Sequence, residues 1–228
     1  MGQATASLAN GDFVILYAKC TSANGGDPAA QGVYLSAAET QRYNSYKSAK
    51  AAQQFLQGRK MIREMLASYL AVTTMNVEVT CLEHIKPVAS CQTSSLKPPK
   101  FNLSHSGDWV VLAIDRHSAL GIDIECETQC DIDAIASLSD LFTQNERAYL
   151  ERQRAPEHME RLFLRLWRGK EAIMKATGKG FALAPNSFEL LTPEGQFKKI
   201  IKAERSTWSL MQITLRTGLD CAIAQLRA

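Results

Sequence analysis

FNLSHSGDWVVLAIDRHSALGIDIE, residues 101–125, is the segment around which the rest of the chain is arranged. Asp123 and Glu125 stand two apart in an apolar run, and alternate side chains of a strand share a face. Both carboxylates therefore point the same way, while Ile122 and Ile124 enter the core. Adjacent carboxylates repel each other, so a cation or a shared proton is needed to hold them together. A half-buried strand with a solvated acidic face is the simpler interpretation of this stretch alone.

Two strands and a helix are predicted around these acids. The apolar runs at residues 110–115 and 120–125 indicate two strands, which we expect to form a hairpin around residues 116–119. A helical period over residues 159–177 predicts a helix that ends at Gly178.

The predicted helix carries a further charged group. At 100° per residue, Trp167, Glu171 and Lys175 fall on one side of it, away from an apolar face. Glu171 and Lys175 are four residues apart, which is typical of a surface salt bridge. A third carboxylate with a lysine one turn away also meets the needs of a phosphate-bound Mg²⁺, which prefers oxygen ligands.

The remaining segments complete an α/β chain of two halves. In the first half we expect a strand at residues 13–18, a loop at 25–28, a capping box at Ser36–Glu39, a helix over 48–71 and a half-buried strand at 75–83. In the second half we expect a short helix near 131–137, a capping box at Thr143–Glu146, strands near 187–191, 207–215 and 219–226, and a turn at Glu194-Gly195. A Pro- and Ser-rich connection at 86–100 separates the halves, whose boundary we place between residues 98 and 99.

The composition is that of an ordinary globular protein. The 228 residues are 46% hydrophobic and 21% charged, and the net charge of +3 does not by itself indicate nucleic acid binding. Basic residues cluster between Lys47 and Arg63 and between Arg161 and Lys179, a pattern that attracts polyanions or an acidic protein surface. Solvated helix faces are the alternative. No signal peptide or apolar run of about 18 residues is visible, which predicts a cytoplasmic protein without a membrane partner.

The cysteines indicate a reducing compartment. They are scattered and form no C-x-x-C pair, which is typical of free thiols in a cytosolic protein. Cys81, His84 and Cys91 could be read as a metal site, but no second paired motif supports that interpretation. The six positions are Cys20, Cys81, Cys91, Cys126, Cys130 and Cys221.

Three motifs in register resemble the signatures of Sfp-type 4′-phosphopantetheinyl transferases. They are FNLSHS at residues 101–106, GIDIE at 121–125 and FLRLWRGKEAIMKATGKG at 163–180. Lys86-Pro87 is similar to the end of the family's G-K-P element, with Ile85 in place of its glycine. The first long helix also matches a G-x-x-x-x-R element with Gly58 and Arg63, so the resemblance extends from about residue 36 to residue 180.

The resemblance implies a fold and a reaction. The fold is a pseudo-dimer of two similar α/β subdomains, residues 1–98 and 99–228, with coenzyme A in the cleft between them and the metal site on the second. The reaction moves the 4′-phosphopantetheine group of coenzyme A to a serine of an apo acyl or peptidyl carrier protein and releases adenosine 3′,5′-bisphosphate. We expect an Mg²⁺-dependent monomer that serves fatty acid, polyketide or nonribosomal peptide biosynthesis and binds no nucleic acid.

Residue roles follow from the same resemblance. The implied Mg²⁺ ligands are Asp123, Glu125 and Glu171. The implied contacts with coenzyme A are Arg42, Lys86, Ser104, His105 and Lys175, and the implied catalytic residues are Glu171, Lys175 and His105. Such a set is suited to phosphoryl transfer, which depends mainly on positioning and on neutralising charge. Glu171 could also take the proton of the attacking serine.

Simpler interpretations exist for several of these residues. His105 could be a core histidine, Ser104 a turn residue, and Trp167 a packing residue without a chemical role. Some members of the family carry two basic residues in the first short helix, which reach the 3′-phosphate of the coenzyme. Here Glu39 replaces one of them and only Arg42 keeps a positive charge.

The carrier is expected to meet basic and apolar side chains near the acids. The basic candidates are Arg165, Arg168 and Lys179, and the apolar candidates are Met174 and Phe181. A non-catalytic module that binds coenzyme A or a carrier, and a metal-dependent pyrophosphate hydrolase, are the competing functions. The presence of all three acids and Lys175 speaks against the non-catalytic module, and the hydrolase predicts breakdown of coenzyme A without any carrier.

Overall fold

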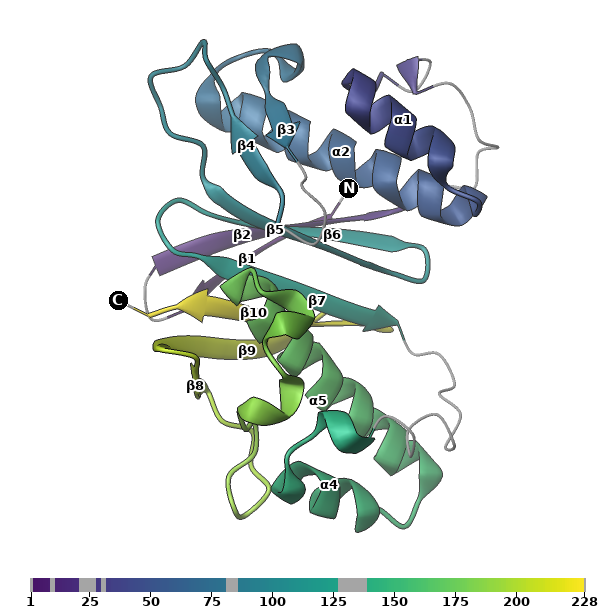
Figure 1. Cartoon of the computed structure of the whole chain (residues 1–228), viewed down its shortest axis with the longest axis vertical. Helices are drawn as coiled ribbons and strands as arrows, with labels where there is room; N and C mark the ends of the chain where they lie inside the picture. Colours follow the sequence, from purple (N-terminus) through teal and green to yellow (C-terminus); the bar gives the residue numbers. More distant parts are fainter. Residues whose placement is uncertain are drawn as a thin grey trace.

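The computed structural model describes residues 2–8, 11–20, 28–29, 32–80, 86–126 and 139–227. Two four-stranded antiparallel sheets lie face to face in the middle of the molecule, and helices cover their outer faces (Figure 1). Each half has one long helix of 22 residues, α2 or α5, packed on its sheet. The predicted fold class, two similar halves with mixed helices and sheets, is confirmed.

The first half contains one main sheet and one small one. The main sheet has the order β1-β2-β6-β5, and its strands are β1 (Gly2–Leu8), β2 (Gly11–Lys19), β6 (Trp109–Asp115) and β5 (Lys100–Ser106). The small sheet pairs β3 (Glu78–Thr80) with β4 (Val88–Ser90). Its helices are α1 (Ala37–Ser45) and α2 (Ala49–Leu70), with a 3₁₀ turn, η2, at Thr74–Asn76.

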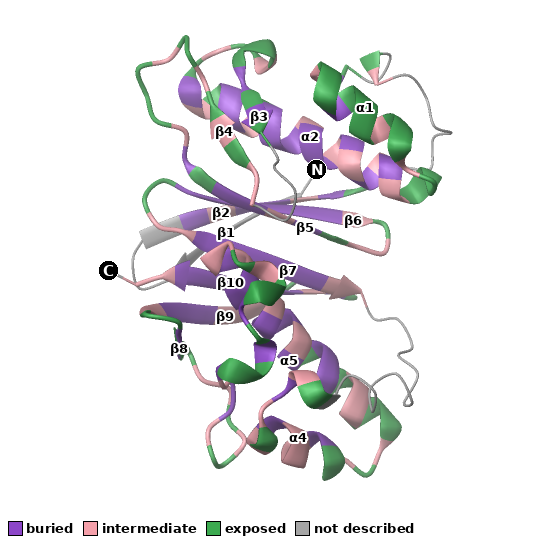
Figure 2. Cartoon of the chain, viewed as in Figure 1, coloured by how far each residue is buried: buried purple, intermediate pink, exposed green. Residues whose placement is uncertain are grey.

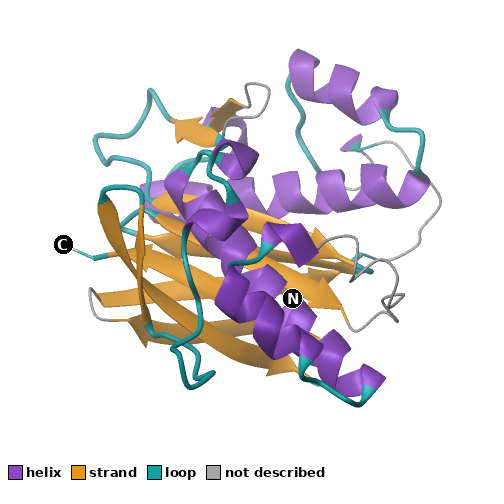
Figure 3. Cartoon of the chain, turned by 60° about the horizontal axis from the view of Figure 1, so that its bottom comes forward, coloured by secondary structure: helices purple, strands orange, loops and turns teal. Residues whose placement is uncertain are grey.

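The second half repeats this plan. Its sheet has the order β7-β10-β9-β8, from β7 (Leu120–Cys126), β10 (Leu219–Leu226), β9 (Ser206–Arg216) and β8 (Ile200–Ala203). Its helices are α4 (Gln144–Glu151) and α5 (Pro156–Thr177), with 3₁₀ turns η3 (Ser139–Leu141), η4 (Gly180–Ala182) and η5 (Pro185–Ser187). In the turned view of Figure 3 the long helices lie against the strands. No described helix is long and apolar enough to cross a membrane.

Three apolar clusters hold these layers together. One lies between α2 and the first sheet, and one lies between α4, α5 and the second sheet. The third fills the space between the two sheets, where Val111 of β6 and Ile122, Ile124 and Ile223 of the second sheet are fully buried. In Figure 2 the central strands of both sheets are coloured mostly as buried. The prediction that Ile122 and Ile124 enter the core is therefore confirmed.

The capping residues in the sequence predicted the ends of several helices correctly. Both predicted capping boxes are present, with Ser36 and Thr143 as N-caps that exchange hydrogen bonds with Glu39 and Glu146. The helix predicted over residues 159–177 ends at Gly178, which adopts a left-handed backbone with φ of 74°. The predicted helix over 48–71 is α2.

The predicted hairpin is wrong. β6 pairs with β2 and β5, whereas β7 pairs with β10, so residues 116–119 carry the chain from one sheet to the other. Asp115 shapes this crossing, because its Oδ1 accepts hydrogen bonds from the N–H groups of His117 and Ser118, both at 2.7 Å. β5 and β6 therefore belong to the first sheet, although the predicted boundary between residues 98 and 99 assigns them to the second half.

Other differences are smaller. Residues 187–191 form no strand: η5 ends at Ser187, and Leu191 makes only an isolated bridge to Phe197. The strand predicted at 75–83 begins with a 3₁₀ turn and is described only as β3, and β1, β4, β5 and β8 were not predicted. The predictions for residues 25–27, Cys81, His84, Ile85 and the helix near 131–137 lie outside the described residues.

Candidate active site

The site lies where β5 and β7, the neighbouring edge strands of the two sheets, face each other. Polar side chains at alternate positions of β5 bind successive N–H groups of β7. These N–H groups need acceptors because no strand of their own sheet lies on this side. The bonds run from the N–H groups of Ile122, Ile124 and Cys126 to Asn102 Oδ1 at 2.8 Å, Ser104 Oγ at 3.3 Å and Ser106 Oγ at 3.1 Å.

The same serines hold the two carboxylates of β7. Ser104 Oγ donates to Asp123 Oδ1, and Ser106 Oγ donates to Glu125 Oε2, both at 2.9 Å. A hydroxyl group can donate one hydrogen bond and accept another, and each serine does both. Asp123 and Glu125 thus share a face, as predicted. Ser104 is buried in the middle of β5, so the alternative that it is a turn residue is wrong.

Gly121 allows α5 to approach this strand closely. A Cβ atom at Gly121 would lie 2.2 Å from the carbonyl oxygen of Ala172 and 2.3 Å from the backbone nitrogen of Ala176. Backbone atoms of a packed helix cannot yield, so only glycine fits at this position. The close packing brings the side of α5 that carries Glu171 and Lys175 next to β7.

Lys175 is the central cation of the site. Its Nζ lies 2.6 Å from Asp123 Oδ1, 3.1 Å from Ser104 Oγ and 4.0 Å from Glu171 Oε2. The sequence spacing indicated Glu171 as the partner, but Asp123 of the facing strand is much closer. The other carboxylate oxygen of Asp123, Oδ2, is buried and has no hydrogen-bond partner among the residues that the structure describes.

The site has more negative charge than Lys175 neutralises. Burial raises the pKa of Glu125, and the charge of Asp123 raises it further, against the opposing effect of the hydrogen bond from Ser106. Burial also raises the pKa of Glu171, and the charges of Asp123 and Glu125 add to the rise against the effect of Lys175. An added cation would stabilise all three carboxylates.

The donor set fits the chemistry of Mg²⁺. Three carboxylates supply the oxygen ligands that this ion prefers, and Asp123 Oδ2 is a buried oxygen that no described residue contacts by a hydrogen bond. Within the described residues no group of three acidic, histidine or cysteine side chains is already arranged to hold a metal. The residue types therefore fit the ion, while Lys175 occupies the position beside Asp123.

A cavity between the two halves adjoins Lys175. It has a volume of about 240 Å³, and Lys86, Asn102, Met174 and Lys175 are among its lining residues. Lys86 Nζ donates a hydrogen bond to the carbonyl oxygen of Leu120. Burial lowers the pKa of Lys86 to about 8, and the charge of Lys100 contributes to the change. Two cations, Lys86 and Lys175, thus face one cavity.

His105 and Arg42 lie less centrally. The alternation of β5 directs His105 away from Ser104 and Ser106, and the histidine is exposed. Partial burial nevertheless lowers its pKa, with a contribution from Lys175. Arg42 is exposed on α1, where its Nε donates to the hydroxyl of Tyr46 at 3.4 Å. Figure 1 shows α1 on the far side of the first half from α5.

Glu39 explains why α1 is held firmly. This buried carboxylate pairs with Arg59 Nε at 2.8 Å and with Arg63 Nη2 at 2.6 Å, both on α2. It also accepts the capping hydrogen bond from the N–H of Ser36. The glutamate that replaces a basic residue of some family members therefore has a structural role.

The residues expected to meet a carrier differ in accessibility. Met174 is only 1% exposed, so it cannot serve as an exposed apolar anchor, whereas Phe181 is 66% exposed. Arg168 is buried and pairs with Asp220 at 3.3 Å, and Lys179 pairs with Glu204 at 2.9 Å. Trp167 packs against the second-half core and its ring lies 6.3 Å from that of Phe181.

Comparison with known proteins decides the family. Residues 119–224 match the family described as the 4′-phosphopantetheinyl transferase superfamily, and residues 29–117 match the 4′-phosphopantetheinyl transferase N-terminal family. The chain belongs to the 4′-phosphopantetheinyl transferase superfamily. The two matches meet at residues 117–119, where the chain of this transferase crosses from one sheet to the other.

Curated relatives agree with this assignment. The transferase is 29% identical to the 4′-phosphopantetheinyl transferase gsp of Aneurinibacillus migulanus, over 84% of its own chain and 76% of the relative. It is 29% identical to HetI of a Nostoc species, over 83% and 78% of the two chains. It is 38% identical to psf-1 of Bacillus pumilus, over 64% and 59%. All three are named 4′-phosphopantetheinyl transferases, and the chain is a transferase of this kind.

Three structural residues of the site were not predicted. Asn102 and Ser106 complete the side-chain ladder between β5 and β7, and Gly121 admits α5. The polar residues at 102, 104 and 106 alternate with Phe101 and Leu103, a period of two that indicates a strand with a polar inner face. A polar face directed into the protein is the signal that could have identified the ladder.

Proposed function

We propose that this transferase moves the 4′-phosphopantetheine group of coenzyme A to a serine of an apo acyl or peptidyl carrier protein, with Mg²⁺ bound by Asp123, Glu125 and Glu171. Adenosine 3′,5′-bisphosphate is the second product. One observation carries the proposal: a single ammonium group lies among three buried or half-buried carboxylates beside a cavity that a second lysine lines.

The carboxylates favour a metal-bound substrate. Their summed charge exceeds that of Lys175, and burial makes the imbalance costly. A bound Mg²⁺ would offset this charge and polarise the phosphate oxygens of the substrate. The geometry supports Asp123 best as a ligand, because it is buried and its Oδ2 has no hydrogen-bond partner in the described part of the chain.

The lysines are suited to phosphate binding. Lys175 and Lys86 line the cavity between the halves, where they would place positive charge on two sides of a pyrophosphate. Ser104 orients Lys175 and Asp123 together through its hydroxyl. We assign His105 to a phosphate contact at the exposed rim, and Arg42 to the outer part of the coenzyme.

Glu171 is the proposed proton acceptor for the carrier serine. Its carboxylate lies 4.0 Å from Lys175 Nζ, so it stands beside the group proposed to hold the phosphates, where a base must lie to take the proton of an attacking hydroxyl. It lies on α5, beside Lys175 and on the side of the helix that faces β7. The attacking hydroxyl, the base and the transferred phosphoryl group would thus meet at one point.

Mass spectrometry of an apo carrier domain tests the proposal. The carrier is incubated with coenzyme A, Mg²⁺ and the protein, and we expect it to gain the mass of one phosphopantetheine group on its serine. A carrier with that serine changed to alanine is the matched control. If several carriers gain no mass, the proposal fails. Breakdown of coenzyme A without any carrier would instead indicate a pyrophosphate hydrolase.

A further inference from the structure

A fourth carboxylate lies beside the three proposed metal ligands. Asp220 of β10 is the direct cross-strand partner of Glu125 of β7. Their chain neighbours Cys221 and Ile124 are buried in the core between the sheets, so Asp220 and Glu125 lie on the opposite face, which α5 covers. Side chains in this relation have Cβ atoms about 5 Å apart, and like charges directly opposite each other destabilise a sheet.

Hydrogen bonds hold these two carboxylates from opposite sides. Glu125 Oε2 accepts from Ser106 Oγ of β5 at 2.9 Å, and Asp220 Oδ1 accepts from Thr214 Oγ1 of β9 at 2.6 Å. β5 lies next to β7, whereas β9 lies beyond β10, so the two donors flank the pair of strands. The repulsion between the two acids is reduced because each is drawn toward its own donor.

Arg168 of α5 neutralises Asp220. Its Nη2 lies 3.3 Å from Asp220 Oδ2, and this is its one ion pair among the described residues. The side chain of Arg168 is only 7% exposed. Its charge also acts on the neighbouring ligand, since burial raises the pKa of Glu125 and Arg168 opposes that rise. A buried cation thus binds the fourth acid at a position from which it also affects a proposed ligand.

Packing does not fix the direction of the Asp220 carboxylate. The side chain of Asp220 is 39% exposed, and it faces a cavity of about 270 Å³ that Arg168 and Thr214 also line. The ion pair and the hydrogen bond are therefore the contacts that keep it turned toward α5 and β9. Without them the carboxylate has room to turn toward Glu125.

A simpler role for Arg168 is to attach α5 to β10. The helix already packs on this sheet through an apolar cluster that includes Ala172 and Ala222. A buried arginine with a partly exposed partner is a costly attachment, because apolar residues of similar volume often stabilise as much. That role also does not explain why the arginine binds the one acid that stands opposite Glu125.

We propose that Arg168 is a positioning residue that holds Asp220 out of the metal site, so that the site favours Mg²⁺ over Ca²⁺. This inference rests on the metal site of the proposed function. Mg²⁺ demands near-ideal octahedral geometry and keeps several waters, whereas Ca²⁺ accepts more oxygen ligands in a flexible geometry. Three carboxylates suit the smaller ion, and a fourth one beside Glu125 would suit the larger.

Competition for bound Mn²⁺ tests the proposal. Electron paramagnetic resonance measures the Mn²⁺ that the protein holds in the presence of coenzyme A, and Mg²⁺ or Ca²⁺ is added to displace it. We expect Arg168→Met to lower the dissociation constant for Ca²⁺ relative to that for Mg²⁺ about tenfold, because a freed Asp220 adds a ligand that the larger ion accepts more easily. The double variant Arg168→Met/Asp220→Asn should restore the wild-type ratio.

Thr214→Val gives a second route to the same result. Thr214 is exposed, so this variant should fold even if Arg168→Met does not, and it removes the other donor to Asp220. The ratio should shift in the same direction by about threefold, since one hydrogen bond is lost while the ion pair remains. Thr207→Val makes the same substitution at the other end of β9 and should leave the ratio unchanged.

Each outcome decides a different point. If Asp123→Ala holds Mn²⁺ as well as the wild type, the proposed metal site fails and this inference fails with it. If Asp123→Ala loses Mn²⁺ but Arg168→Met keeps the wild-type ratio, the inference is overturned while the metal site stands, and a loss of stability alone would assign Arg168 to the attachment of α5. An unchanged ratio in Thr214→Val overturns the inference where Arg168→Met does not fold. A shift that persists in Arg168→Met/Asp220→Asn also overturns it, because Asp220 would not be the carboxylate that Arg168 controls.

Discussion

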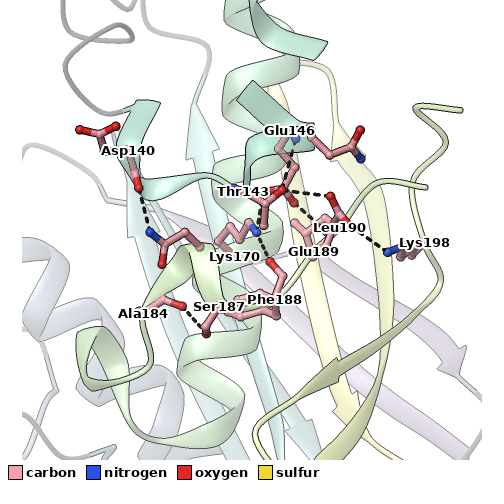
Figure 4. Close-up of polar contacts among 12 residues, drawn as sticks. Asp140, Thr143, Glu146, Lys170, Ala184, Ser187, Phe188, Glu189, Leu190 and Lys198 are labelled. Atoms are coloured by element: carbon pink, nitrogen blue, oxygen red, sulfur yellow. Dashed lines mark hydrogen bonds and ion pairs between the residues drawn. The ribbon is translucent and has the colours of Figure 1, made fainter. Parts of the chain in front are cut away.

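Two lysines of α5, five residues apart, lie in opposite kinds of ionic environment. Lys170 and Glu146 are both fully buried, with Nζ 2.7 Å from Glu146 Oε2, and Nζ also donates to the carbonyl oxygen of Phe188 (Figure 4). Glu146 Oε1 accepts a hydrogen bond from the N–H of Leu190 at 2.7 Å. Lys175, with a side chain 28% exposed, instead lies among three carboxylates, and one oxygen of Asp123 has no hydrogen-bond partner within the described ranges.

Lys170 belongs to a structural ion pair, whereas Lys175 belongs to the candidate active site. At Lys170 one positive charge meets one negative charge, and both groups make a further hydrogen bond, Lys170 to the carbonyl oxygen of Phe188 and Glu146 from the N–H of Leu190. Burial lowers the pKa of Lys170, and Glu146 opposes this by stabilising the ammonium. At Lys175 the charges do not balance and solvent reaches the lysine, so a ligand can enter. The buried pair of Lys170 and Glu146 holds α4, α5 and residues 188–190 together. Lys175 and its carboxylates remain accessible to a substrate or a metal ion.

The largest expected effect is on stability at Lys170. Lys170→Met leaves the buried carboxylate of Glu146 without a cation, which should lower the free energy of unfolding by about 3–5 kcal/mol. Urea denaturation measures this loss. Because the site residues are untouched, kcat per folded molecule should stay near that of the wild type.

The double variant Lys170→Met/Glu146→Gln, whose amide oxygen can still accept a hydrogen bond from the N–H of Leu190, is the control for this prediction. It removes both charges, so it should be more stable than Lys170→Met alone. A loss below about 1 kcal/mol in Lys170→Met would contradict the description of the pair as closed and essential to the fold.

The next effect is on activity at Asp123. Asp123→Ala removes the carboxylate that contacts Lys175 and Ser104, and with it one proposed metal ligand. Transfer to the carrier should fall about 1000-fold, because charge stabilisation at the phosphoryl group is lost. Asp123→Asn keeps the shape and the hydrogen bond from Ser104, and it should be almost as inactive. Near-normal turnover of Asp123→Ala at low Mg²⁺ would show that the three acids do not form the metal site.

Substitution of Lys175 should affect activity more than stability, the reverse of what is expected for Lys170→Met. Lys175→Ala should lower kcat/KM for coenzyme A about 100-fold, since a cation at the phosphates is lost. Its free energy of unfolding should fall by less than that of Lys170→Met, because Lys175 is 28% exposed and solvent can reach the site, although the buried Asp123 loses its cation. Lys175→Arg should recover only part of the activity, because the planar guanidinium places its donors differently.

Lys179 provides the matched control. It lies four residues further along the chain and pairs with the exposed Glu204, so Lys179→Ala should leave both kinetics and stability near wild type. Wild-type kinetics in Lys175→Ala would make this lysine a surface partner of the acids and nothing more.

Sequence alone predicted the cluster around Lys175 better than the cluster around Lys170. The alternation Ile-Asp-Ile-Glu placed Asp123 and Glu125 on one face, and helical spacing placed Glu171 and Lys175 together. Both patterns are local. The closeness of Lys175 to Asp123 depends on how α5 packs against β7, which the sequence reveals only through Gly121.

The cluster around Lys170 could not be predicted because its residues are far apart along the chain. The capping box at Thr143–Glu146 was predicted, but the same glutamate also pairs with Lys170, and spacing within one helix cannot show such a contact. The hairpin prediction failed for a related reason. Period-two patterns identify strands at 110–115 and 120–125 but do not say which strands they pair with, and β6 and β7 join different sheets.

The smallest effect is expected at Lys86, which unlike Lys170 and Lys175 makes no ion pair among the described residues. Burial lowers its pKa to about 8. The folded free enzyme therefore loses this cation as the pH rises through about 8. If Lys86 binds a phosphate of coenzyme A, the dissociation constant should rise about tenfold between pH 7 and pH 9, because the neutral amine must first take up a proton. Calorimetry at fixed free Mg²⁺ would measure it, and Lys86→Arg, which stays charged, should flatten the profile. A wild-type dissociation constant that is independent of pH over this range would remove Lys86 from the coenzyme site and leave Lys175 as the one lysine of the cavity that acts on phosphate.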